Sequence, residues 1–109
     1  MSFHARDYDE GVTNVKQLEQ FRVEINQLDA KLVELLGQRF SVCLEVAQFK
    51  KEQQIPMMQP DRIEIVKQSC RELGQQHGVN GDFIDSLYTL IIGEACRLET
   101  EIIGVEDLV

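Results

Sequence analysis

Two cations and one acid occupy positions where apolar side chains are expected. Arg39 stands where the heptad repeat of an apolar helix face predicts an aliphatic residue. Lys50 follows eleven residues later, close to three whole helical turns, so both side chains project from nearly the same side. Glu99 lies at the centre of a second apolar stripe, between Ala95 and Ile102. Because burying an unpaired charge costs several kcal/mol, these three residues indicate either an internal ion network or a binding site.

Both interpretations stay open on the pattern alone. In the first, Glu99 neutralises Lys50 or Arg39 and the charges are structural. In the second interpretation, the cations form a binding site for a small anion that carries more than one acidic group. Arg22 flanks the same helix face and Arg62 opens a later helix, so up to four cations face one acid. This surplus of positive charge favours an anionic ligand.

The seam that contains Arg39 predicts one long helix from about Asn14 to Gln54. Its apolar residues recur at alternating steps of three and four: Leu18, Phe21, Ile25, Leu28, Leu32, Leu35, Val42, Val46 and Phe49. Asn14 is the expected N-cap, and Pro56 ends the helix.

Such a helix would be about 60 Å long, whereas a compact monomer of this size has a radius of gyration near 13 Å. A second copy of the chain is the simplest cover for the seam, which predicts an intertwined homodimer. The alternative is a helix broken near Gly37 and a monomeric bundle.

Two shorter helices follow, and no segment has the alternation of a strand. We expect them at about Pro60–His77 and Gly81–Ile103, the second capped by Asn80 and ended by Gly104. The predicted fold is all-α with three helices per chain. The expected organisation is an N-terminal tail over 1–13, a helical domain over 14–104 and a C-terminal tail over 105–109.

Composition narrows the function classes. The chain has 109 residues and a formal net charge of -8, which argues against binding to nucleic acid or to an anionic membrane. The N-terminal residues lack the apolar run of a signal peptide. Cys43, Cys70 and Cys96 form no CxxC motif and no zinc spacing, so we expect reduced thiols in a cytoplasmic protein without a metal.

Four segments carry a resemblance to the all-helical chorismate mutase family: FRVEINQLDAKLVELLGQR, VAQFKKEQQIP, DRIEIV and LYTLII, between about Gln17 and Ile103. The order and intervals of Arg22, Arg39, Lys50 and Arg62 are similar to the motif of that family. The resemblance implies three-helix chains in intertwined dimers, which agrees with the argument from helix length.

The resemblance also implies a role for each matching residue. Arg39 and Lys50 would hold the two substrate carboxylates, and Arg22 would reach the site from the partner chain. Lys50 would also donate a hydrogen bond to the ether oxygen whose bond breaks, and Arg62 would support the rim of the pocket. Glu99 falls where many bacterial members have Gln, the second donor to that oxygen, and where some fungal members have Glu.

Conversion of chorismate to prephenate is a concerted rearrangement of one dianion. The resemblance therefore implies no cofactor, no metal and no nucleophile; holding the folded conformer and aiming fixed donors at the ether oxygen can supply the catalysis. A carboxyl group donates a hydrogen bond only when it is protonated, so we expect activity to require neutral Glu99 and to decline at alkaline pH.

Three positions depart from the family pattern. Gln59 and Ile63 stand where mutases typically have acidic residues that recognise the ring hydroxyl, and Ala95 replaces a frequent Ser near the ring. Chorismate mutase is the first hypothesis. The alternatives are a 4-amino-4-deoxychorismate mutase or an isochorismate-pyruvate lyase using the same site, and a helical dimerisation or regulatory module without activity.

Overall fold

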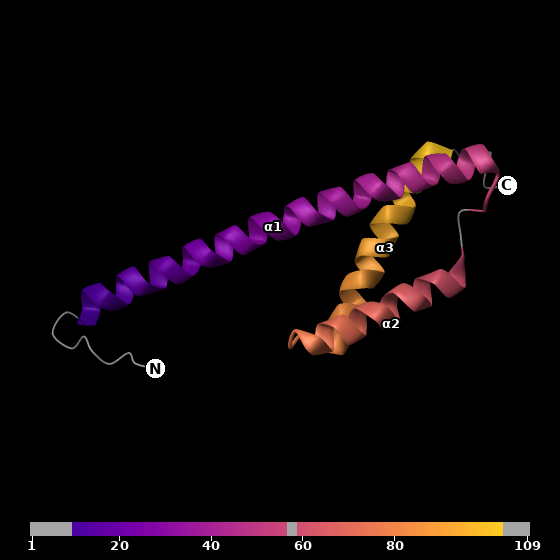
Figure 1. Ribbon diagram of the computed structural model, residues 1–109. Helices are drawn as coiled ribbons and strands as arrows, with labels where there is room; N and C mark the ends of the chain where they lie inside the picture. The colour runs from indigo at the N-terminus through magenta and orange to yellow at the C-terminus, as the bar shows by residue number, and fades with distance from the viewer. Residues whose placement is uncertain (1–9, 57–58, 104–109) are drawn as a thin grey trace. The chain divides into compact units, whose positions relative to one another are not determined.

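The structure is a computed structural model that describes residues 10–56 and 59–103. It contains three helices, α1 (Glu10–Gln53), α2 (Pro60–Gln76) and α3 (Gly81–Ile103), and no strand within the described residues (Figure 1). The all-α prediction is therefore confirmed. The expected end of α3 at Gly104, the C-terminal tail and residues 1–9 of the N-terminal tail lie outside the described residues.

The long first helix begins one turn earlier than predicted. Asn14 lies inside α1 rather than at its N-cap, since the helix starts at Glu10. Adding a turn to an existing helix requires no new nucleation. The helix continues through Gly37, so the predicted alternative of a break at that glycine is wrong.

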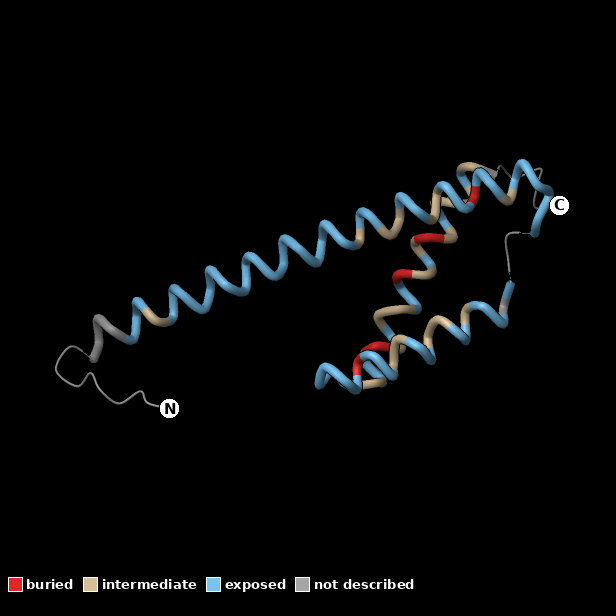
Figure 2. The backbone as a smooth tube through the Cα atoms, viewed as in Figure 1, coloured by how far each residue is buried: buried red, intermediate tan, exposed pale blue. Residues whose placement is uncertain are grey.

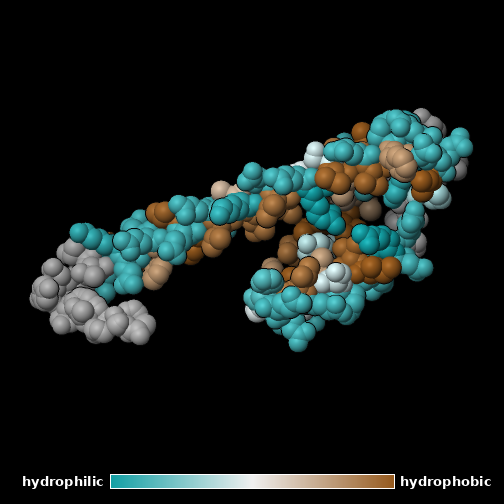
Figure 3. Space-filling view, in the orientation of Figure 1, coloured by the Kyte–Doolittle hydropathy of each residue, from teal (hydrophilic) through white to brown (hydrophobic). Residues whose placement is uncertain are grey.

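The chain divides into two units, Met1–Gln38 and Arg39–Val109, and each is described by itself. In the first unit, the large apolar side chains of the seam are exposed, with exposed fractions between 46% at Leu18 and 63% at Leu28. Figure 3 shows hydrophobic surface along this part of α1. Burying one such side chain contributes about 1.5–3 kcal/mol, so this exposed seam is a surface suited to packing against another apolar face.

The second unit contains the core. Its buried apolar residues are Ala47 on α1 and Ile84, Ile91 and Ala95 on α3 (Figure 2). Helices α2 and α3 pack against each other. Gly74 permits their close approach, because a Cβ atom there would lie 2.8 Å from Ile84 Cγ1. An ion pair between Arg71 and Asp85 links the same two helices.

A tight turn joins α2 to α3. The Val79 N–H donates to the Gly74 carbonyl at 2.7 Å, the Gly78 N–H donates to the Gln75 carbonyl, and Gly78 has φ +75°. These are the two bonds of a Schellman motif, in which glycine takes the left-handed conformation without strain. Asn80 then caps α3 as predicted, since its Oδ1 accepts the Phe83 N–H at 2.9 Å.

Candidate active site

The face that α1 turns toward α3 carries the site residues. Ala47 is fully buried, and Arg39, Cys43 and Lys50 on the same stripe are half-buried. By contrast, the neighbouring seam residues Val42, Val46 and Phe49 remain exposed. At about 100° per residue, the two stripes lie roughly a quarter turn apart on the helix. Within this unit the half-buried stripe that contains Arg39 therefore lies beside the exposed seam.

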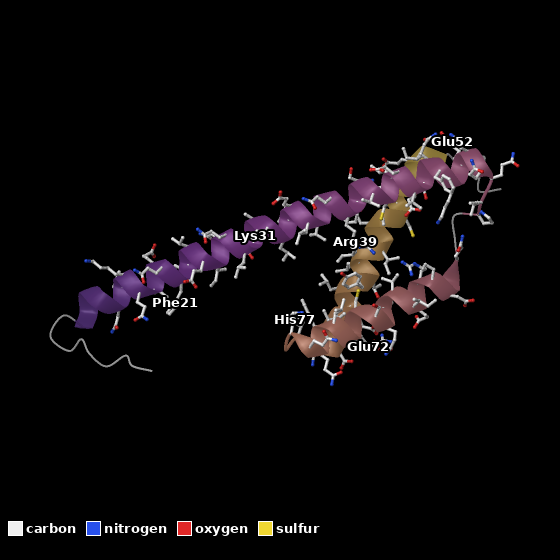
Figure 4. All side chains as sticks on the ribbon, viewed as in Figure 1. Phe21, Lys31, Arg39, Glu52, Glu72 and His77 are labelled. Carbon is white, nitrogen blue, oxygen red and sulfur yellow. The ribbon has the colours of Figure 1, made fainter. Side chains whose placement is uncertain are left out.

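Two neutral groups contact the Arg39 guanidinium. Its Cζ lies 5.7 Å from the centroid of the Tyr88 ring on α3, and its Nη1 donates to Cys43 Sγ at 3.8 Å. Figure 4 shows Arg39 on α1 beside α3. No carboxylate lies within ion-pair distance of Arg39 among the residues that the structure describes. This cation is therefore available to an anionic ligand.

Glu99 is half-buried and is electrostatically coupled to both site cations. Burial raises the pKa of Glu99 above its ordinary value, and the positive charges of Lys50 and Arg39 offset part of that shift. The structure thus brings together the inward-facing charges that the sequence predicts. Because of its burial, Glu99 stays neutral to a higher pH than an exposed carboxyl group does.

Two thiols share this environment. Burial raises the pKa of Cys43, and burial together with the charge of Glu99 raises the pKa of Cys96. Both groups are therefore neutral at pH 7 and are poor nucleophiles.

A side-chain contact connects the end of α1 to the end of α3. Lys51 Nζ donates to the Ile102 carbonyl at 3.2 Å, which satisfies one of the last carbonyls of α3. Lys51 is next to Lys50 in the chain, and Ile102 lies about one turn after Glu99. The bond therefore helps to fix the spacing of Lys50 and Glu99.

Arg22 lies in the first unit, and its place relative to the site is not defined. Its guanidinium pairs with Glu19 at 2.8 Å on its own helix, and both side chains are 60% exposed. An exposed pair of this kind is worth at most about 1 kcal/mol, so the arginine can exchange Glu19 for another anion.

The remaining predicted residues lie on α2 and α3. Gln59 precedes α2 and is exposed, with its carbonyl accepting the Arg62 N–H at 2.9 Å, and Arg62 is exposed as well. Ile63 is half-buried, and Ala95 is buried one turn before Glu99 on the same helix. No described contact joins the side chains of Gln59 or Arg62 to Glu99, so their place in the site stays a prediction.

Two contacts of Arg39, with Cys43 and with Tyr88, were not predicted from the sequence. Cys43 lies four residues after Arg39, and side chains at that spacing meet on a helix, so the contact could have been predicted. Tyr88 belongs to the apolar stripe of α3 that also contains Ala95 and Ile102. Its contact with Arg39 depends on how α1 and α3 cross, for which the sequence contains no local signal.

The arrangement combines an unneutralised guanidinium, an ammonium and a carboxyl group that favours its neutral form. Such a site can bind a small polyanion and donate hydrogen bonds to it. Among the described residues, no helix is long and apolar enough to cross a membrane. The described fold is all-helical, and the charges of this site suit a small organic anion.

Comparison with known proteins defines the family. Residues 21–100 match the chorismate mutase type II family, and the chain belongs to that family. It is accordingly an enzyme of the isomerase class. The family membership sets aside the hypothesis of a helical module without activity.

Relatives with two different names illustrate the family. A 4-amino-4-deoxychorismate mutase of Streptomyces venezuelae is 32% identical over 89% of this chain and 94% of its own length. A second protein of that name, from Streptomyces pristinaespiralis, is 37% identical over 77% of this chain and 65% of its own length. A chorismate mutase of Methanocaldococcus jannaschii is 26% identical over 72% of this chain and 79% of its own length.

Proposed function

We propose that this protein catalyses the concerted rearrangement of a chorismate-type dianion. Its preferred substrate is 4-amino-4-deoxychorismate, and chorismate is a poorer substrate. In this reaction the ether C–O bond breaks while a C–C bond forms within the same molecule. The observation that carries the proposal is the Arg39 guanidinium, which is half-buried beside Tyr88 and lacks a carboxylate partner among the described residues. A substrate carboxylate would complete this site.

Each charged residue has a distinct role in the proposal. Arg39 binds a carboxylate through its planar fork, and Lys50 binds the second carboxylate and donates to the ether oxygen. Glu99, in its neutral form, donates to the same oxygen. Both donors are fixed before reaction, and they stabilise the negative charge that develops on the oxygen in the transition state.

The preference for the amino substrate rests on the relatives and on two residues. Two relatives at 32% and 37% identity are named for 4-amino-4-deoxychorismate, while relatives named for chorismate mutase, alone or joined to prephenate dehydratase, are 26–31% identical. Ile63 cannot accept a hydrogen bond from a ring substituent, and Gln59 is neutral. The site therefore lacks the acids that chorismate mutases typically use for the ring hydroxyl.

We further propose an intertwined homodimer in which Arg22 of one chain completes the site of the other. The exposed seam of residues 14–38 supports the dimer, because its large apolar side chains need a partner surface. Gln59, Arg62 and Ile63 would line the ring side of the pocket, with Ala95 beneath the ring. We place the protein in the cytoplasm, where its free cysteines would stay reduced.

A product assay on three substrates tests the proposal. Purified protein is incubated separately with 4-amino-4-deoxychorismate, chorismate and isochorismate, and products are identified by mass and NMR. We expect the highest kcat/KM for the amino compound, with the rearranged isomer as product, and slower turnover of chorismate. Release of pyruvate from isochorismate as the fastest reaction would identify a lyase instead. Turnover of none of the three would reject the proposal.

A further inference from the structure

The contacts of Arg39 are unusual for a half-buried cation. A guanidinium removed from water normally pairs with a carboxylate, because its desolvation is otherwise uncompensated. Here the partners are the Tyr88 ring, at 5.7 Å from the centroid, and the Cys43 sulfur, at 3.8 Å. Both partners are neutral, so they hold the guanidinium without cancelling its charge.

Tyr88 is partly buried and lies near Cys70. Burial and a hydrogen bond with Cys70 raise the pKa of Tyr88, as expected when the phenol is the donor. Cys70 lies on α2, Tyr88 on α3 and Arg39 on α1. Two contacts, Cys70–Tyr88 and Tyr88–Arg39, therefore link α2 through α3 to the cation on α1.

We propose that Tyr88 is a positioning residue, which uses its ring face to hold the Arg39 guanidinium oriented for a substrate carboxylate. The inference rests on the proposed function of Arg39. A cation within about 6 Å of an aromatic centroid is attracted by the negative face of the ring. This attraction restricts a long, flexible side chain before substrate arrives, so less conformational freedom is lost on binding. An acid in the same place would hold the arginine equally well but would compete with the substrate.

The proposal predicts a specific division between kinetic constants. Arg39 binds a carboxylate that stays charged throughout the reaction, so its orientation affects ground state and transition state alike. Loss of the ring should raise KM about tenfold and lower kcat by less than about threefold. A merely structural role would instead reduce the fraction of active enzyme, which lowers kcat and leaves KM unchanged.

Four variants separate the ring from the hydroxyl group and from general packing. Tyr88→Leu removes the ring and should show the rise in KM. Tyr88→Phe keeps the ring and loses only the bond to Cys70, so its KM should stay within about threefold of wild type. Phe83→Leu removes an exposed aromatic from the same helix and should change neither constant. Pentafluorophenylalanine at position 88 keeps the shape but reverses the ring quadrupole, and should match Tyr88→Leu even if the leucine variant folds poorly.

A double-mutant cycle tests whether Tyr88 acts through Arg39. In an Arg39→Ala background, Tyr88→Leu should change kcat/KM by less than about twofold. An undiminished tenfold effect there, or a pentafluorophenylalanine variant with the KM of Tyr88→Phe, would overturn the proposal.

An NMR measurement on the free protein keeps this proposal distinct from the proposed function. The ring current of Tyr88 should shift the Arg39 Hε resonance upfield, and Tyr88→Leu should remove that shift while Phe83→Leu preserves it. If wild type turns over no substrate, the proposed function fails whatever this spectrum shows. If wild type is active but the Hε shift and KM do not respond to Tyr88→Leu, only the role of Tyr88 fails.

Discussion

At the scale of single residues, the surroundings of two half-buried charged side chains determine their ion pairing and their protonation. Arg39 is held by neutral groups, and Glu99 is buried enough that its pKa rises despite two nearby cations. The sequence predicts which charges turn inward, because they interrupt apolar stripes. It does not predict the pKa of Glu99, which depends on the distances across the crossing of α1 and α3.

The first prediction concerns pH. Since the pKa of Glu99 is raised, its neutral form is retained at higher pH than that of an exposed glutamate. If the neutral form is the donor, kcat should fall as pH rises through the pKa of Glu99, approaching about tenfold per pH unit above it. Glu99→Gln carries a neutral donor at every pH, and its kcat should be level.

Steady-state kinetics of both proteins between about pH 5 and 9 would check this expectation. The profile of Glu99→Gln serves as the control for any titration of the substrate or of other residues. Flat and equal profiles for both proteins would show that protonation of Glu99 has no part in catalysis.

At the scale of the helices, α3 is the element on which the site depends. It packs against α2 at Gly74, contacts Arg39 through Tyr88, and accepts a hydrogen bond from Lys51 at its last turn. Helix ends and caps were largely predictable: the bounds of α2 and α3 agree with the sequence to within a residue, because Pro60, Gly78 and Asn80 act locally. The packing partners of each helix face were not predictable, as the exposed Val42, Val46 and Phe49 illustrate.

Gly74→Ala tests the close approach of α2 and α3. The added Cβ would lie 2.8 Å from Ile84 Cγ1 and 3.2 Å from the Val79 carbonyl oxygen, so the Ile84 side chain or the backbone beside it must shift. We expect the free energy of unfolding to fall by about 1–3 kcal/mol, although alanine is the better helix former.

Gly93→Ala is the matched control, since a Cβ at Gly93 meets nothing within 4 Å. It should raise the free energy of unfolding by about 0.5–1 kcal/mol. Urea denaturation at one fixed protein concentration would measure both. Equal effects of the two substitutions would contradict the proposed tight crossing.

At the scale of the whole molecule, the main feature is the seam of residues 14–38, whose large apolar side chains are exposed in the first unit. The heptad pattern predicts the seam and its continuous helix, and the structure confirms the helix. Whether a second chain covers the seam is a proposal, as is the delivery of Arg22 to the partner's site. The dimer follows from the cost of leaving a large apolar stripe in water, and the role of Arg22 follows from the resemblance to the family motif.

Mixing two inactive variants tests the shared site. If Arg22 acts on the partner chain, Arg22→Ala and Arg39→Ala should each be inactive alone. Co-refolding them in equal amounts should restore about a quarter of wild-type activity, because half of the dimers are mixed and each has one intact site. Activity no higher than that of the separate variants would argue for a site within one chain.

The central claim is that the guanidinium of Arg39 is held in place for a substrate carboxylate. Its most direct test is kcat/KM of Arg39→Ala beside Arg97→Ala, which removes an exposed arginine already paired with Glu94 and Glu101. With both variants folded, we predict a loss of at least about a hundredfold for Arg39→Ala and a change within about twofold for Arg97→Ala. An Arg39→Ala variant as active as Arg97→Ala would contradict the account.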